Sequence, residues 1–88
     1  MVNKHLTVQI PEGLHFRAVA KIRWISLEQQ CSVVFQNGNG EKAHSDSLLE
    51  MLAISAIAGT RLHVTVDGRN ENRTLTMIEE VFENGAGI

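Results

Sequence analysis

Apolar and polar side chains alternate along four segments of the chain, at residues 2–10, 31–35, 41–44 and 61–68. A period of two is typical of a strand with one buried face, so we predict four strands. In the last of them, Leu62, Val64 and Val66 are expected to point inward. The Asn-Gly pair at residues 37–38 predicts a hairpin between the second and third strands, because both residues tolerate a positive φ.

Three further segments have the longer period of a helix. From Phe16 to about Gln29, apolar residues recur at helical spacing. A nearly all-apolar segment follows Ser47, where Glu50 gives the spacing of a capping box; Gly59 can end this segment, although the helix itself can stop a turn or two earlier. Asn70 is predicted to cap a last helix. Its apolar stripe consists of Leu75, Ile78, Val81 and Phe82.

The predicted order is therefore β-α-β-β-α-β-α. One-sided alternation in the strands favours an antiparallel sheet with one face in water and the helices on the other. We predict a single α+β domain over residues 1–88, an open-faced β-sandwich with a four-stranded antiparallel sheet and three helices on one face. The Gly-rich end, residues 83–88, is expected to fray.

Composition and charge exclude several classes of protein. Eighty-eight residues suffice for one small core, and no apolar run reaches the roughly 20 residues of a membrane span. The first residues lack the apolar core of a signal peptide. Cys31, the single cysteine, cannot form an internal disulfide, lies on the inward phase of its strand and fits a reducing cytoplasm. A net charge of −2 gives no general attraction to nucleic acid or to an anionic membrane.

The stretch GLHFRA, residues 13–18, places His15 at the predicted start of the first helix. Unpaired N–H groups and the helix dipole make such a position a ready anion site, and the fork of Arg17 suits phosphate oxygens. Gly13 permits the tight turn that exposes the ring. An imidazole can also act as a nucleophile toward phosphorus. The alternative is that His15 is simply a polar residue tolerated at a helix start.

The stretch GLHFRAVAK resembles the active-site signature of the HPr family, the histidine-containing phosphocarriers of the sugar phosphotransferase system (PTS). The Asn-Gly hairpin, SLLEMLAISAIAGT and VDGRNENRTL extend the resemblance over the whole chain. It implies that His15 accepts a phosphoryl group on Nδ1 from enzyme I and passes it to IIA proteins, with Arg17 as the phosphate partner. The family has a proline where this chain has Ala18, which we place at the first helical position, and a small residue where it has Phe16.

Ser47 matches a serine that a dedicated ATP-dependent kinase, HPr kinase/phosphorylase, phosphorylates in many family members. A serine at a helix start is also explained by capping alone. Asp46 stands where the family often has a lysine, and its carboxylate would repel an incoming phosphate.

The resemblance also implies a partner surface on the first two helices, an apolar patch with a basic rim. Its predicted residues are Phe16, Ala20, Trp24, Leu27, Leu48, Leu49 and Met51. Burial of Trp24 in the core is an equally open alternative. Arg17, Lys21 and Arg23 form the rim, or else an ordinary solvated helix face.

The remaining features predict little chemistry. His5 and His63 fall on the outward phase of their strands; with His44 they show no metal-ligand spacing, so no metal or cofactor is expected. No Walker-type glycine loop is present, so the chain should not bind ATP and should be a phosphorylated substrate more than a catalyst. Three interpretations stay open: a phosphocarrier, an HPr-like regulatory protein that carries little or no phosphate, and a generic binding module. Few aromatic residues argue against the last of these as a nucleic-acid binder. We expect a cytoplasmic monomer.

Overall fold

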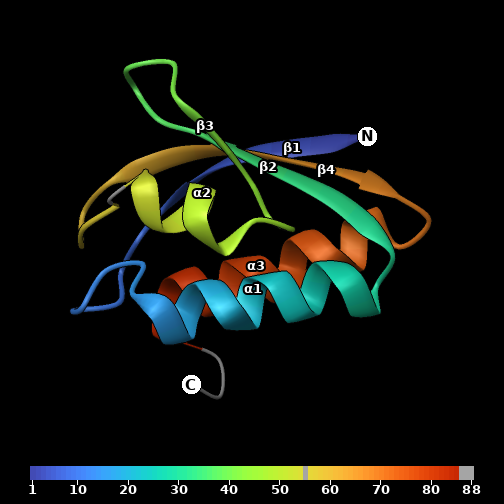
Figure 1. Cartoon of the computed structure of the whole chain (residues 1–88). Helices are drawn as coiled ribbons and strands as arrows, with labels where there is room; N and C mark the ends of the chain where they lie inside the picture. Colours follow the sequence, from blue (N-terminus) through green and yellow to red (C-terminus); the bar gives the residue numbers. More distant parts are fainter. Residues whose placement is uncertain (55, 86–88) are drawn as a thin grey trace.

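The computed structural model describes residues 1–54 and 56–85 and contains two layers, a sheet and a set of helices (Figure 1). The strands are β1 (Val2–Thr7), β2 (Cys31–Gln36), β3 (Lys42–His44) and β4 (Arg61–Gly68). The helices are α1 (Phe16–Glu28), α2 (Leu48–Ala53) and α3 (Glu71–Asn84). The element order is the predicted one, and the predicted α+β open-faced sandwich is confirmed.

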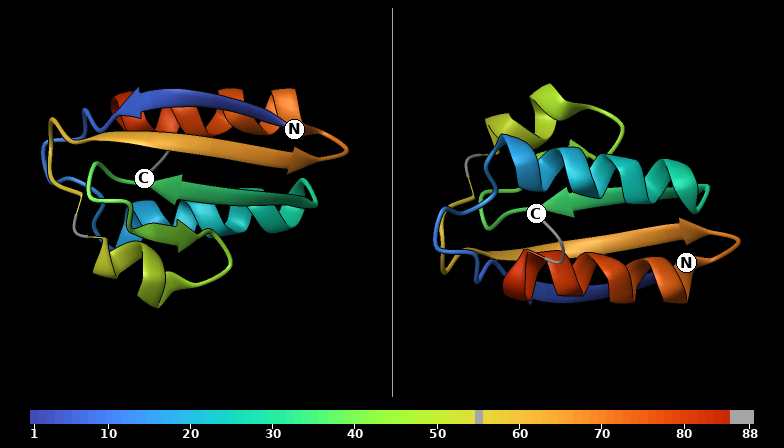
Figure 2. Two further views of the ribbon diagram at one scale, coloured as in Figure 1. Left: turned by 90° about the horizontal axis from the view of Figure 1, so that it is seen from above. Right: turned by 90° about the horizontal axis from the view of Figure 1, so that it is seen from below.

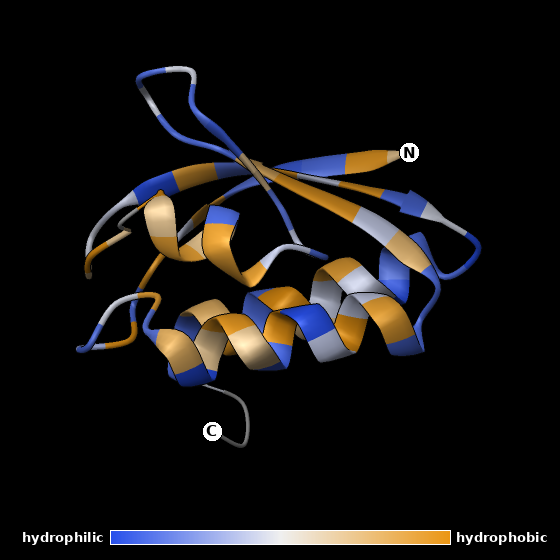
Figure 3. Ribbon diagram, viewed as in Figure 1, coloured by the Kyte–Doolittle hydropathy of each residue, from blue (hydrophilic) through white to orange (hydrophobic). Residues whose placement is uncertain are grey.

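The sheet has the strand order β1-β4-β2-β3, and every pair of neighbours is antiparallel. Hydrophobic and hydrophilic residues alternate along its strands (Figure 3). Leu62, Val64 and Val66 of β4 are fully buried, as predicted. Burial of the apolar side chains of the strands on one face commits the other face to solvent.

The helices cover only the apolar face of the sheet (Figure 2). Helices α1 and α3 run in opposite directions, and the start of α1 lies at the same end of the molecule as the end of α3 (Figure 1). The short helix α2 packs beside β3 and against α1. This arrangement leaves the outer face of the sheet uncovered by any helix within the described residues, and it brings the start of α1 and the end of α3 together at one end of the molecule.

One element ends at the earlier point that the sequence allowed, and another ends before the predicted residue. The apolar segment after Ser47 is helical only to Ala53, which is the early end allowed by the sequence; Ser55 lies outside the described residues. Beyond it, the Ala56 carbonyl accepts from the Leu14 N–H, and the Gly59 N–H donates to the Val8 carbonyl. These hydrogen bonds go to other parts of the chain, so this segment does not continue the helix; Ala56 is buried, whereas Ile57 is 72% exposed.

The first strand ends at Thr7 and not at Ile10, although the Val8 N–H still pairs with the Thr60 carbonyl. The side chain of Asn70 stands at the start of α3 but makes no capping hydrogen bond, so the predicted cap is wrong in that respect. The last three residues of the tail predicted to fray, 86–88, lie outside the described residues.

Cys31 is half-buried and packs against the core, with its Sγ 3.2 Å from Oγ1 of the fully buried Thr74 on α3. Its inward direction is thus as predicted. None of the helices within the described residues is long and apolar enough to cross a membrane.

Candidate functional site

A tight turn connects β1 to α1 and presents His15. Gly13 has a φ of +73°, a left-handed conformation that side chains disfavour. A Cβ at this position would lie 2.7 Å from the Ala56 carbonyl oxygen, so only glycine fits between the turn and the segment after α2. The neighbouring Leu14 is buried, and its N–H donates to the same carbonyl over 2.8 Å. Gly13 and Leu14 therefore both hold the turn against the segment after α2, the first by close contact and the second by a hydrogen bond.

His15 is the N-cap residue of α1, as the sequence predicts. Its Nδ1 accepts a hydrogen bond from the Arg17 backbone N–H over 3.2 Å. An accepting nitrogen carries a lone pair, so in the neutral ring the proton resides on Nε2. The cap therefore orients Nδ1 toward the N–H groups of the first helical turn, where the helix dipole is positive.

The half-buried ring of His15 opens onto a pocket of about 740 Å³ at the end of the molecule where α1 begins and α3 ends. Its lining residues are Ile10, Pro11, Glu12, His15, Phe16, Arg17, Asn84 and Gly85. Within the described part of the chain, the Arg17 guanidinium has no hydrogen-bond or ion-pair partner. A free guanidinium, a helix N-terminus and an imidazole lone pair at one pocket can together hold an anion.

Ala18 occupies the third position of α1, because the helix begins at Phe16. The sequence-based placement at the first position is thus wrong by two residues. The side chain of Ala18 is fully buried, and the first N–H of the helix to bond within it is that of Val19, to the His15 carbonyl. The N–H of Ala18 is one of the donors that a helix start leaves unpaired, so alanine here adds a donor to the anion site.

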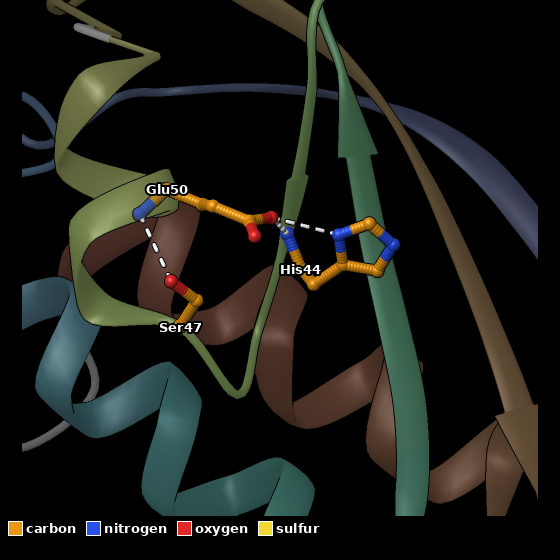
Figure 4. Close-up of polar contacts among 3 residues, drawn as sticks. All are labelled: His44, Ser47 and Glu50. Carbon is orange, nitrogen blue, oxygen red and sulfur yellow. Dashed lines mark hydrogen bonds and ion pairs between the residues drawn. The ribbon is translucent and has the colours of Figure 1, made fainter.

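Ser47 begins α2 in a similar way. Its Oγ accepts a hydrogen bond from the Glu50 N–H over 3.2 Å, which is half of the predicted capping box. The other half is absent, because the Glu50 carboxylate turns away and accepts from both the backbone N–H and the ring Nδ1–H of His44, at 2.9 and 2.7 Å (Figure 4). The hydrogen bond from the His44 ring, followed by the one from its backbone, lowers the pKa of Glu50 below its ordinary value of 4.5.

Comparison with known proteins places this chain in a family. Residues 2–84 match the family model of the PTS HPr component phosphorylation site. The chain belongs to the HPr family. A phosphocarrier protein HPr from Xylella fastidiosa (strain Temecula1) is 30% identical over 84 residues, which cover 96% of this chain and 93% of that protein.

Other members of the HPr family extend the similarity. A phosphocarrier protein NPr from Proteus mirabilis is 27% identical over 73 residues, covering 83% of this chain and 81% of the relative. The crystal structure of an HPr from Thermoanaerobacter tengcongensis superposes with a TM-score of 0.87 at 16% identity, covering 100% of this chain and 98% of that one. At that identity the superposition establishes the fold alone. The family match and the names of these relatives support a phosphocarrier role in the PTS.

Most apolar residues of the predicted HPr partner surface are exposed. Phe16, Trp24 and Leu27 follow one another at helical spacing on α1 and are each more than half exposed, as is Leu49 on the adjacent α2. The alternative of Trp24 in the core is therefore wrong. The prediction that Met51 belongs to the partner surface is also wrong, since Met51 is 1% exposed and belongs to the core. Leu48 is half-buried and packs against the core, and Ala20 is half-buried.

The basic residues of α1 differ in what they contact. Lys21 places its Nζ 4.9 Å from the centre of the Trp24 ring, a cation–π contact at the surface. Arg23 donates from Nε to the Asp46 carbonyl over 3.4 Å and so links α1 to the start of α2. Of the three predicted rim residues, only Arg17 thus stands free at the pocket.

One arrangement was missed by sequence reasoning. His5 and His63 are direct partners across β1 and β4, and their rings stack with centroids 4.7 Å apart. Both point to the outer face, as predicted, but they are not isolated from one another. No signal in either segment alone could have brought them together, because the contact depends on the register of β1 against β4.

Proposed function

We propose that this chain carries a phosphoryl group on Nδ1 of His15, accepts it from enzyme I and passes it to IIA proteins. The observation that supports this proposal most is the N-cap hydrogen bond from Arg17 to Nδ1. It selects the tautomer in which Nδ1 is the nucleophile and Nε2 carries the proton. The same nitrogen faces the first turn of α1, where an anionic phosphoryl group is stabilised.

The transfer is a substitution at phosphorus. The Nδ1 lone pair of His15 forms the new N–P bond while the bond from phosphorus to the donor breaks, and the donor atom leaves with its electron pair. The phosphoryl oxygens then take over the helix-start N–H groups, including that of Ala18, and the guanidinium of Arg17 balances their charge. The Nε2 proton stays on the ring, so no other base is needed for uptake.

The surroundings of His15 suit contact with other proteins. Phe16 borders the pocket and is 62% exposed, and Trp24 and Leu27 extend the apolar strip along α1. Aromatic anchors in such a position dominate binding at protein interfaces. We infer that enzyme I and IIA proteins dock on this strip, with Leu49 at its border.

The test is phosphoryl uptake from phosphoenolpyruvate through enzyme I, followed as acid-labile label on the chain. We expect rapid labelling of the wild type and none of His15→Ala. His44→Ala, which removes an exposed histidine distant in sequence from the pocket, serves as the matched control and should label normally. A folded wild-type chain that takes up no label from its cognate enzyme I would overturn the proposal and favour an HPr-like regulatory protein that binds partners without carrying phosphate.

A further inference from the structure

The outer face of the sheet carries a pair of imidazoles that the proposed function does not use. His5 on β1 lies directly opposite His63 on β4, and no helix covers this face (Figure 2, left). The ring centroids are 4.7 Å apart, and the ring planes are inclined by 28°. Inclined planes converge on one side, so ring edges approach one another there.

Asn3 fixes the tautomer of His63. Nε2 of His63 lies 3.0 Å from Oδ1 of Asn3, an amide oxygen that can only accept, so Nε2 carries the proton. The lone pair of the neutral ring is then on Nδ1. A histidine that donates one N–H to an oxygen while its other nitrogen is free is arranged as metal-binding histidines are. His5 has no hydrogen-bond partner within the described residues, and its ring contact is with His63 alone.

We propose that His5 and His63 form a binding site for a borderline divalent transition-metal ion such as Zn²⁺ or Ni²⁺. Two metal–nitrogen bonds of about 2.1 Å hold the nitrogens roughly 3.4 Å apart at a tetrahedral angle and about 3 Å apart at a right angle. Starting from the stacked rings, rotation about the broad χ2 torsion of His5, which no hydrogen bond within the described residues holds, would turn its nitrogens toward Nδ1 of His63. Imidazole nitrogen suits zinc and nickel, whereas magnesium and calcium prefer oxygen ligands.

The surrounding pocket has room for the ion and its remaining ligands. It measures about 570 Å³ and is lined by His5, Gln36, Asn37, Gly38, Arg61 and His63. Gln36 is the partner of His63 on β2, one strand further along the same row. Within the described residues, no group of three or more His, Cys, Asp or Glu could hold a metal ion. The proposed site therefore offers two protein nitrogens, and water would fill the remaining coordination positions of the ion.

Arg61 is the feature that opposes a cation here. Its guanidinium lines the pocket and has no partner within the described chain. A unit charge about 4 Å from a divalent ion in water weakens binding by roughly thirtyfold, which the two imidazole–metal bonds must outweigh. A variant of Arg61 also distinguishes a metal ion from the alternative ligand, an anion. Arg61→Gln should raise the affinity of the site for a metal ion and lower its affinity for an anion.

The experiment is calorimetric titration of the full chain with Ni²⁺ and Zn²⁺, with Mg²⁺ as the hard-ion comparison. We expect one saturable site for Ni²⁺ and Zn²⁺ and none for Mg²⁺. His5→Gln and His63→Gln should each weaken binding by at least about tenfold. Asn3→Ala should weaken it by about tenfold, through loss of the hydrogen bond that orients the His63 ring. Because these side chains are at the surface, dispersed amide NMR spectra should show that each variant is folded.

Two variants serve as controls, His15→Gln at the pocket beside α1 and His44→Gln at the edge of the sheet. Both should bind Ni²⁺ as the wild type does. The proposal is overturned if no saturable binding occurs up to millimolar metal, or if binding survives in both His5→Gln and His63→Gln. It is equally overturned if either control loses the binding. Phosphoryl uptake on His15 should be unaffected by His5→Gln and His63→Gln, so this test and that of the proposed function fail independently.

Discussion

The starts of α1 and α2 share a capping geometry but differ in charge. At each, a side chain accepts a backbone N–H from the first turn over 3.2 Å: His15 from Arg17, and Ser47 from Glu50. The first turn of α1 contains a guanidinium and no acidic residue, whereas that of α2 contains Glu50 and follows Asp46. The two caps are alike in their hydrogen bonds and unlike in what they can attract.

This difference shows that a capping hydrogen bond is not by itself a phosphoryl site. An N–H donor pointing from a helix start stabilises an anion only where the surrounding charge does not oppose it. At Ser47 the Glu50 carboxylate, held by His44, already supplies a negative charge close to the helix start. We therefore propose that Ser47 acts as a structural cap, and that His15 is the group to which phosphate is transferred.

After the loss of His15 itself, the largest effect on phosphoryl uptake should come from removing the Arg17 guanidinium at the start of α1. Arg17→Gln keeps the backbone N–H that bonds to His15 but removes the charge that balances the phosphoryl group. We expect the rate of phosphoryl uptake to fall at least about tenfold, since charge-assisted hydrogen bonds to phosphate are worth more than about 1.4 kcal/mol. The measurement is the initial rate of labelling through enzyme I at limiting donor.

Arg23→Gln is the matched control on the same helix. Arg23 contacts the Asp46 carbonyl and does not line the pocket, so uptake should stay near the wild-type rate. Equal rates for Arg17→Gln and the wild type would show that the guanidinium does not serve the phosphoryl group.

The next effect concerns the stability that the Ser47 cap gives to the start of α2. Ser47→Ala removes the Oγ that accepts from Glu50, and loss of such a cap should lower the free energy of unfolding by about 1 kcal/mol. Phosphoryl uptake on His15 should not change. Urea denaturation measures the first quantity, and Ser47→Asp, which keeps a capping oxygen, should recover most of the loss. A fall in uptake for a folded Ser47→Ala variant would contradict a purely capping role.

A smaller effect is expected from restoring the family's proline. In Ala18→Pro the lost N–H is one that the helix leaves unpaired, and the hydrogen bond from Arg17 to His15 is untouched. Because the Ala18 N–H is one of several donors at the helix start, and the φ that proline fixes in exchange is helical, we expect the loss to be partly offset and the uptake rate to change by less than about threefold, or roughly 0.65 kcal/mol in the barrier. Stopped-flow labelling measures it, with a thermal melt to show that the ring fits the buried position. A tenfold increase would mean that Ala18 limits transfer, contrary to this argument.

Much of this comparison was predictable, because it depends on local sequence. Both caps stand immediately before a helical period, and the short-range chemistry of histidine and serine at such positions is general. The length of α2 was harder to predict. Every residue from Leu48 to Ala58 except Glu50 and Ser55 is apolar or alanine, so no polar face marks the side or the end of the helix. For the same reason the burial of Met51 beside the exposed Leu49 could not be foreseen.

The pairing of His5 with His63 was not predictable from either strand alone. Their contact depends on which residues of β1 and β4 face one another, and a shift of the register by two residues would separate them while keeping the same faces buried. Likewise, the turn of the Glu50 carboxylate toward His44 depends on the packing of α2 beside β3. Local periodicity determines faces, whereas contacts between distant segments require the register and the packing.

The smallest expected effect is on the pH dependence of stability, and it tests the Glu50 carboxylate, which makes the start of α2 differ in charge from that of α1. Because hydrogen bonds from His44 lower the pKa of Glu50 in the folded chain, the folded state binds this proton less readily than the unfolded state. The resulting stability is present above pH 4.5, the ordinary pKa, and is lost as the pH falls through the lower folded value. Since the group is exposed, the contribution should be smaller than that of the Ser47 cap.

Glu50→Gln isolates this contribution, because the amide oxygen can still accept from His44 but no longer titrates. The difference in urea midpoint between the wild type and Glu50→Gln should therefore shrink from pH 6 to pH 3. Glu28→Gln, at an exposed carboxylate with no partner within the described residues, should show no such pH dependence. A constant difference for Glu50→Gln over that range would mean that the His44 contacts do not favour the charged carboxylate in solution. The negative charge proposed to distinguish α2 from α1 would then lack its structural support.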